Sequence, residues 1–219
     1  MPQGHLVSAV CPTRASRIEY LPTAIRCFQN QTYQHRELVI VSEDDVTAVI
    51  PSDTRIRLLR CPPGLTLGLK RTIGAEAASG DVVAHWDDDD LYHPARLSEQ
   101  QAILTPDKPI TGYRSIRFYS VVDGHARAYH YHDDALVLGT SITYRRSVLT
   151  EHPYPDLTHG DECIWLAGLG SLLTATDGLD RCIALDHDGN TCPRIYTTSY
   201  SAIDRAETLG LMQEWSSPK

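Results

Sequence analysis

A chain of 219 residues, 42% of them hydrophobic, can bury one substantial core, so we expect a single domain. Its formal net charge of -8 argues against a general nucleic-acid binder, because affinity for a phosphate backbone comes from Lys and Arg. The charge leaves room for a small phosphorylated ligand, which needs only a few local cations or a metal ion.

No apolar stretch of the sequence is long enough to cross a bilayer, and the first residues lack the basic and apolar regions of a signal peptide. We therefore expect a cytoplasmic protein without a membrane span. The six cysteines are scattered, and none forms a pair with the short spacing of a zinc site or redox motif. Reduced thiols are expected.

The first half of the chain alternates strands with helices. Strands are predicted at residues 6–11, 37–41, 56–60 and 82–86, and helices at residues 20–28, 69–78 and 94–104, the last beginning in the segment 91–97. This alternation predicts a parallel α/β sheet with right-handed crossovers. In such sheets ligands bind beyond the carboxyl ends of the strands.

The second half adds antiparallel strands. Asp123 and Gly124 separate two apolar runs, which is a strong hairpin signal for strands at residues 117–122 and 125–131. Further elements are predicted as strands at 136–144 and 182–185 and as helices at 145–150, 161–169 and 202–215. The expected fold class is a mixed, mainly parallel central sheet flanked by helices, with an added antiparallel hairpin.

Four consecutive aspartates, residues 87–90, follow the buried strand that ends at Trp86. Adjacent carboxylates repel one another, so a folded protein holds them together only if something positive arrives. A divalent cation is the simplest candidate, and oxygen ligands favour Mg²⁺ or Mn²⁺. Because alternate residues of an extended segment share a face, either Asp87 with Asp89 or Asp88 with Asp90 can approach one ion.

A solvated acidic loop is the alternative interpretation of this run, and it is the commoner one for acidic segments in general. The buried strand before the aspartates and the predicted helix after them favour a cation site instead.

The N-terminal half resembles the family-two glycosyltransferases, which are inverting enzymes with the Rossmann-like GT-A fold and nucleotide-sugar donors. The resemblance rests on residues 7–13, which end in Pro-Thr, on Asn-Gln-Thr-Tyr at 30–33, and on the strand that enters acids at 38–44. It continues with residues 70–74 and 78–81 and with the aspartates, which are similar to the family's Asp-x-Asp motif. It covers roughly the first hundred residues.

This resemblance implies a donor-binding half at residues 1–104 and an acceptor-binding half at residues 105–219. The nucleotide base and ribose would lie by Pro12, Thr13 and Arg14, with Glu43 or Asp44 accepting from the base. Arg71 matches a position near the diphosphate, Asp87 and Asp88 would face the ribose and the metal, and Asp89 would be the direct metal ligand. The family usually has Asp at the position of Ser42 and Asn at that of Thr72.

In the later half, residues 160–166 resemble the family's acidic pair at a helix start, whose second acid is the general base. This assigns the base to Glu162, with Asp161 as its neighbour or substitute, although the family's usual order is Glu then Asp. For both acids the alternative is a charge that complements the helix dipole. His187 lies where some GT-A enzymes place a metal or diphosphate ligand; its alternative is a histidine bonded within its own turn.

Other metal or sugar sites are less favoured. The hairpin carries a group of acids and histidines that more often forms a solvated face than a metal site: His125, His130, His132, Asp133 and Asp134. Trp86 and Trp165 are expected in the core rather than as stacking platforms for sugars.

The parts together imply metal-dependent, inverting transfer of a sugar from a nucleotide diphosphate, with UDP as the expected nucleotide, to an acceptor hydroxyl. The metal would stabilise the departing diphosphate, and Glu162 would take the acceptor proton. One alternative is nucleotidyl transfer, but the loop after the first strand lacks the glycines of a phosphate loop. Another is a non-catalytic nucleotide-sugar binder.

Overall fold

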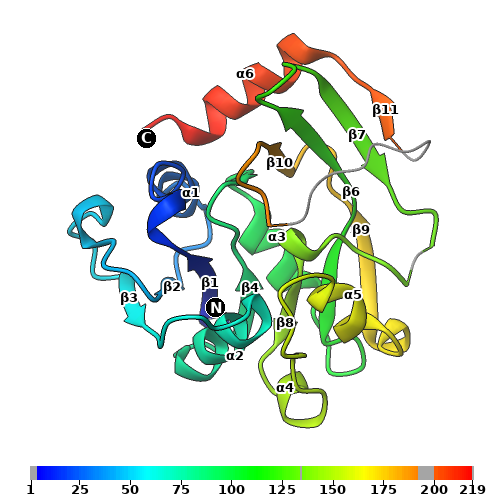
Figure 1. Ribbon diagram of the computed structural model, residues 1–219. Helices are drawn as coiled ribbons and strands as arrows, with labels where there is room; N and C mark the ends of the chain where they lie inside the picture. The colour runs from blue at the N-terminus through cyan, green and yellow to red at the C-terminus, as the bar shows by residue number, and fades with distance from the viewer. Residues whose placement is uncertain (1–3, 134, 192–199, 219) are drawn as a thin grey trace.

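The computed structural model describes residues 4–133, 135–191 and 200–218. Its strands join in one 11-stranded sheet in which β11, β7, β6, β8, β4, β1, β2 and β3 are successive neighbours, with β10 and β9 also paired to β6 and β5 paired to β10 (Figure 1). The first four strands of the chain run parallel to one another: β1 (Val7–Thr13), β2 (Arg36–Ser42), β3 (Ile56–Arg60) and β4 (Val82–His85). The predicted mixed, mainly parallel sheet is confirmed.

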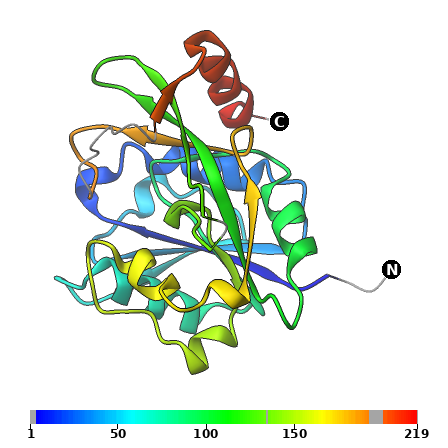
Figure 2. The ribbon, with the colours of Figure 1, turned by 90° about the vertical axis from the view of Figure 1, so that its right-hand side faces the viewer.

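Helices cover both faces of the sheet at β1, and the side chains of this strand point alternately to the two helices. Val7, Ala9 and Cys11 pack with α1 (Leu21–Gln29), whereas Val10 packs with α2 (Leu67–Ala77). Successive strand side chains point to opposite faces, so a strand covered on both sides is apolar throughout. Figure 2 shows α1 and α2 on opposite sides of the strands.

The antiparallel additions occupy the second half. β6 (Ile110–Ser120) and β7 (Ala126–His130) form the predicted hairpin, and β11 (Tyr200–Ala202) pairs with β7. β8 (Thr143–Arg145) runs antiparallel between β4 and β6, and so joins the two halves into one sheet. The remaining elements are β10 (Cys182–Asp186), α3 (Arg96–Ile103), α4 (Val148–Glu151), α5 (Asp161–Leu166) and α6 (Arg205–Ser216).

Several sequence-based boundaries are wrong. Leu91–Tyr92 is not the start of a helix but the short strand β5, which pairs with β10, and α3 begins only at Arg96. The predicted strand at 136–144 is mostly irregular, with a 3-10 turn at Gly139–Ser141 before β8. Strand β9 (Leu173–Asp177) has no counterpart among the predicted elements. Only its first residue is buried, so its side chains do not alternate between buried and exposed.

Trp86 anchors the aspartates to this framework. Its side chain is fully buried, its indole N–H donates to Ala24 O at 3.1 Å, and its ring packs on Phe28 and Tyr92. Its backbone N–H donates to Val10 O at 3.0 Å, which extends the pairing of β4 with β1 by one residue. The aspartates therefore leave the sheet from a fixed point, and Trp86 is a core residue as predicted.

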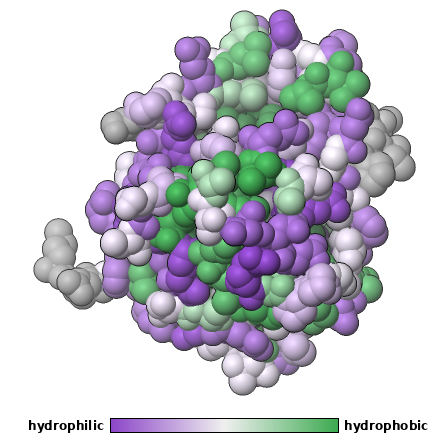
Figure 3. Space-filling model, turned by 60° about the vertical axis from the view of Figure 1, so that its left-hand side comes forward, coloured by the Kyte–Doolittle hydropathy of each residue, from purple (hydrophilic) through white to green (hydrophobic). Residues whose placement is uncertain are grey.

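The sequence also leads to expectations for the surface and the cysteines. No helix in the described part of the chain is long and apolar enough to span a membrane. Figure 3 shows hydrophilic side chains over most of one face, with an apolar patch near its middle. The five cysteines within the described ranges form no disulfide with one another, as expected for reduced thiols; Cys192 lies outside these ranges.

Gly68 allows α2 to pack closely against the loop that leads to α5. A Cβ at this residue would lie 1.9 Å from Pro155 O, and the Gly68 N–H donates to Leu157 O at 2.9 Å. We expect Gly68→Ala to lower the free energy of unfolding by about 1–3 kcal/mol, because the helix or the loop must move apart.

Gly210→Ala is the matched control, since that glycine lies in α6 with nothing within 4 Å of an added Cβ. We expect it to raise the free energy of unfolding by up to about 1 kcal/mol, because Ala favours a helix more than Gly does. Urea unfolding measures both variants. A Gly68→Ala protein as stable as the wild type would contradict the close packing of α2.

Candidate active site

A cavity of about 430 Å³ opens beyond the carboxyl ends of β1 and β4, with walls from both halves of the chain. Apart from Asp44 and His187, every residue assigned a role from the sequence lines it: Pro12, Thr13, Arg14, Glu43, Arg71, Asp87, Asp88, Asp89, Asp161 and Glu162. The predicted convergence of these segments at one edge of the sheet is therefore observed.

Each carboxylate of the aspartate run has a partner on another element, and two of them share one. Asp87 Oδ1 accepts from Arg71 Nη2 at 3.1 Å, and Asp90 Oδ1 accepts from the Leu185 N–H at 3.1 Å. Asp88 Oδ1 lies 2.7 Å from Arg17 Nη2, which also contacts Asp89 Oδ2. The positive charge that the run requires is supplied by arginines from other elements.

The prediction that alternate aspartates share a face is wrong. Residues 88 and 89 form a turn rather than an extended segment, so the adjacent Asp88 and Asp89 converge on one guanidinium. Thr13, the last residue of β1, donates to Asp88 Oδ2 at 2.6 Å and fixes the direction of that side chain. Burial raises the pKa of Asp88 to about 7, and Arg17 opposes the shift.

The acids after β2 point in two directions. Glu43 lines the cavity, accepts from the Gly64 N–H at 2.6 Å and pairs with Lys70 Nζ at 3.2 Å. Asp44 instead accepts from the Ala15 N–H at 2.6 Å, and it holds the loop that follows β1. Of the two candidates, Glu43 is the one that faces the cavity.

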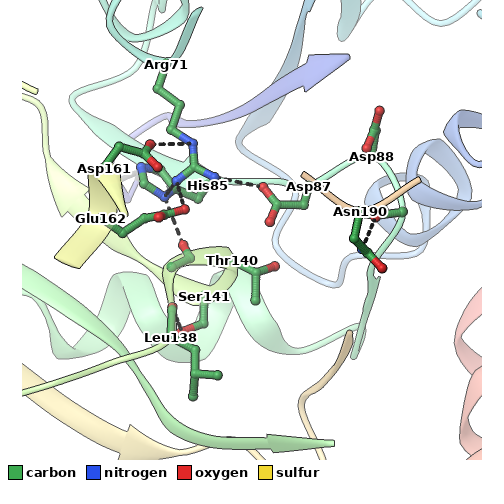
Figure 4. A network of polar contacts seen from close by, with 12 residues as sticks. Arg71, His85, Asp87, Asp88, Leu138, Thr140, Ser141, Asp161, Glu162 and Asn190 are labelled. Atoms are coloured by element: carbon green, nitrogen blue, oxygen red, sulfur yellow. Dashed lines mark hydrogen bonds and ion pairs between the residues drawn. The ribbon is translucent and has the colours of Figure 1, made fainter. Parts of the chain in front are cut away.

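Arg71 links the aspartate run to the acid pair of α5. Figure 4 shows its guanidinium between Asp87 on one side and Asp161 and Glu162 on the other. Nη1 lies 2.7 Å from Glu162 Oε1, and Nε lies 3.9 Å from Asp161 Oδ2. The side chain is 2% exposed, because α2 turns this residue inward against His85 and Tyr154.

The two acids of α5 differ in their ionisation. Burial raises the pKa of Asp161 to about 7; the neighbouring Glu162 adds to the shift and Arg71 opposes it. Burial also pushes the pKa of Glu162 upward, but the charge of Arg71 and the hydrogen bonds that the carboxylate accepts together outweigh burial, and the pKa is lowered. At neutral pH Glu162 is therefore an ionised carboxylate at the cavity wall, beside a carboxyl that is partly protonated.

His187 approaches the aspartates from the loop after β10. Its Nε2 lies 3.0 Å from Asp89 Oδ2, its ring stacks on Tyr20 with centroids 4.3 Å apart, and its Nδ1 accepts from the Gly189 N–H at 3.0 Å. Its ring is 6% exposed and lies behind Asp89 rather than at the cavity wall.

Asp89 and His187 carry ligand types that suit a divalent cation, and here His187 Nε2 is hydrogen-bonded to Asp89, a bond that ligation by this nitrogen would replace. A carboxylate oxygen and an imidazole nitrogen both suit Mn²⁺. The described residues contain no group of three or more His, Cys, Asp or Glu side chains that could hold a metal. The donors therefore fit an ion whose remaining ligands are water and substrate phosphate oxygens, as is usual for Mg²⁺ at phosphate sites.

The profile of Glycosyl transferase family 2 matches residues 8–159. The chain belongs to this family. A curated relative from Haemophilus influenzae, described as an uncharacterized glycosyltransferase, is 28% identical over 102 residues, which cover 43% of this chain and 40% of that protein. The aligned segment thus spans well under half of this relative.

Solved structures share the fold of this family-2 chain. S. aureus TarS 1-349 in complex with UDP-GlcNAc superposes with a TM-score of 0.65 at 14% identity, covering 95% of this chain and 71% of that one. The mannosyltransferase PcManGT from Pyrobaculum calidifontis, in complex with GDP-Man and Mn²⁺, gives a TM-score of 0.61 at 13% identity, covering 84% of this chain and 57% of that one. The resemblance inferred from the sequence and its GT-A fold are confirmed.

Two residues of this family-2 site have no assignment from the sequence. Arg17 binds two aspartates, and Asn190 Nδ2 lies 3.2 Å from Asp89 Oδ2 and lines the cavity. The signal for Arg17 is a second arginine in the loop after the first strand, and that for Asn190 is a turn that also contains His187. Neither signal specifies its partner, because both contacts bridge distant segments.

The residues of the less favoured sites have other neighbours in the described structure. His125 pairs with Asp123 at 3.1 Å, the rings of His130 and His132 lie 5.4 Å apart, and no three-ligand group arises there among the described residues. Asp133 accepts from the Ala135 N–H, and Asp134 lies outside the described residues. Trp165 is 4% exposed and donates to His152 O at 2.8 Å, so it belongs to the core as predicted.

The ionisation of Asp161 should make stability depend on pH. Its pKa is higher in the folded than in the unfolded protein, so its ionisation costs stability as pH rises from about 4 to about 7. We expect Asp161→Asn to remove this cost, so that the variant loses less stability than the wild type between pH 5 and pH 8. The difference should be on the order of 1–3 kcal/mol.

Urea unfolding at both pH values, without metal or nucleotide, measures this difference. Equal losses of stability in the two proteins would contradict the raised pKa of Asp161.

Proposed function

We propose that this protein transfers a sugar from a nucleotide diphosphate donor, with UDP as its nucleotide, to an acceptor hydroxyl, with inversion and with the help of Mn²⁺ or Mg²⁺. The observation that carries the proposal is an ionised Glu162 facing the aspartate run across one cavity, with Arg71 between them. Family membership and the structural neighbours with UDP-GlcNAc and with GDP-Man and Mn²⁺ support it.

The proposed donor half is residues 1–104. Pro12, Thr13 and Arg14 would lie along the base and ribose, because they form the cavity wall at the end of β1. Glu43 would accept from the base, and Asp44 would support that wall through the Ala15 N–H. These assignments place the nucleotide beside the aspartates.

The second group of donor contacts would bind the ribose and the diphosphate. Asp87 and Asp88 would face the ribose, and Arg71 would contribute positive charge near the diphosphate. Asp89 and His187 would hold the cation, and Asp87, the third candidate ligand, would join them by leaving Arg71. When bound, the cation supplies charge that stabilises the departing diphosphate.

The proposed acceptor half is residues 105–219, and it contributes the general base. Glu162 would take the proton from the acceptor hydroxyl while that oxygen bonds to the anomeric carbon and the bond to the diphosphate breaks. Attack from the face opposite the leaving group inverts the configuration. Asp161 would act as the neighbour that tunes Glu162, since it lies deeper against Arg71.

Donor preference is tested by thermal unfolding with a panel of nucleoside diphosphates, each with Mn²⁺, with Mg²⁺ or with EDTA. A ligand that binds the native state raises the melting temperature, so UDP with metal should give the largest shift. Donor hydrolysis and transfer assays on UDP-sugars then test turnover. Stabilisation without turnover would indicate a binding protein rather than a transferase.

We expect Glu162→Gln to keep donor binding and to lose roughly 10²- to 10⁴-fold in turnover, because the amide cannot accept the acceptor proton. Thermal stabilisation by UDP with Mn²⁺ measures binding, and a donor-consumption assay measures turnover.

Glu151→Gln on α4 is the control, since it makes the same chemical change at an exposed residue outside the cavity lining and should leave turnover near that of the wild type. If Glu162→Gln retains full activity, the base is Asp161 or another group.

A further inference from the structure

Arg17 joins three segments that are distant in sequence. It lies in the 3-10 turn Ala15–Arg17 after β1, and its side chain is 10% exposed. Nη2 contacts Asp88 Oδ1 at 2.7 Å and also Asp89 Oδ2, while Nη1 donates to Gly189 O at 3.2 Å. One guanidinium thus contacts two aspartates and ties down the loop that carries His187.

The oxygen that a cation needs on Asp89 is already occupied. Asp89 Oδ2 contacts Arg17 Nη2, His187 Nε2 at 3.0 Å and Asn190 Nδ2 at 3.2 Å. Three donors crowd an oxygen that has about two lone-pair sites, and Arg17 is the one among them with a permanent positive charge. A divalent ion at this oxygen would also lie beside a positive guanidinium, which is strongly unfavourable in a buried site.

Arg17 has a hydrogen-bond donor that no described residue uses, and it faces the cavity. Its Nε is buried without a hydrogen-bond partner among the described residues, so the present position does not satisfy the whole side chain. The residue lines the cavity, where a diphosphate could accept its donors. Arg71 also lines the cavity, and its Nε also lacks a hydrogen-bond partner among the described residues, but its ion pairs are with Asp87 and Glu162 rather than with Asp89.

We propose that Arg17 is a displaceable counter-ion, which occupies the cation's place on Asp89 in the free protein and turns to the donor diphosphate when the metal binds. This inference rests on the proposed function. Metal and Arg17 exclude one another on Asp89, so removing Arg17 strengthens metal binding to the free protein. By linkage, the diphosphate raises metal affinity partly by drawing Arg17 away.

The test is the affinity of the free protein for Mn²⁺ without nucleotide, measured by the EPR signal of unbound Mn²⁺. Arg17→Met should bind Mn²⁺ about tenfold more tightly than the wild type, within the usual range of coupling between sites. The gain in Mn²⁺ affinity on adding UDP should be smaller in the variant than in the wild type.

Arg205→Met is the matched control, because it removes the same charge from an exposed position on α6, outside the cavity lining. Its Mn²⁺ affinity without nucleotide should stay within about twofold of the wild type, far below the coupling expected for Arg17. If Arg17→Met does not fold, Arg17→Gln gives the same reading, since it removes the charge and keeps a polar side chain. Unchanged or weaker Mn²⁺ binding by the Arg17 variant overturns the proposal.

This outcome is distinct from failure of the proposed function. Tighter Mn²⁺ binding by Arg17→Met supports the counter-ion even if no UDP-sugar is turned over. Turnover of a UDP-sugar with unchanged Mn²⁺ affinity in the Arg17 variant supports the transferase and overturns the counter-ion.

Discussion

The site depends on holding four adjacent carboxylates in place against their mutual repulsion. Two arginines from different elements hold three of them, Arg17 from the loop after β1 and Arg71 from α2, and Asp90 accepts from the Leu185 N–H. The aspartates can reach these arginines because Trp86, the residue before them, is buried in the core and fixes where the run begins. Without the sheet behind it, the same acidic run would be a solvated loop.

The arginines also divide the run into two parts. Arg71 connects Asp87 with Glu162, and so couples the electrostatics of the aspartates to the acid pair on α5. Arg17 and His187 meet at Asp89, where the proposed cation would bind. The pKa of Asp88 and that of Asp161 are raised to about 7 by burial, whereas Arg71 keeps Glu162 ionised. Similar residue types thus acquire different charges from their surroundings.

The parallel half of the fold could be predicted from the sequence because its signals are local. Residues 56–60 form β3 with the expected bounds, and the strand before the aspartates differs by one residue. β9 and the segment 136–142 were mispredicted, because their structure depends on pairing with β6 and on the turn at Gly139–Ser141 rather than on a periodic pattern. Short edge strands such as β5 give almost no local signal.

The same difference between local signals and long-range contacts applies to the site. Most of the predicted residues line the cavity, since the carboxyl ends of parallel strands must meet at one edge. Which arginine pairs with which aspartate could not be predicted, because the turn at residues 88–89 and the loop of His187 lie far apart in sequence. Asp44 shows the same limit, since its partner is a backbone N–H on another loop.

The central claim is that a cation on Asp89 joins this wall to a donor diphosphate. The most direct test is a crystal structure of the protein with UDP and Mn²⁺, in which anomalous scattering locates the manganese. The account predicts an anomalous peak between Asp89 and the diphosphate oxygens. A bound UDP whose diphosphate lies away from Asp89, with no peak beside that carboxylate, would contradict it.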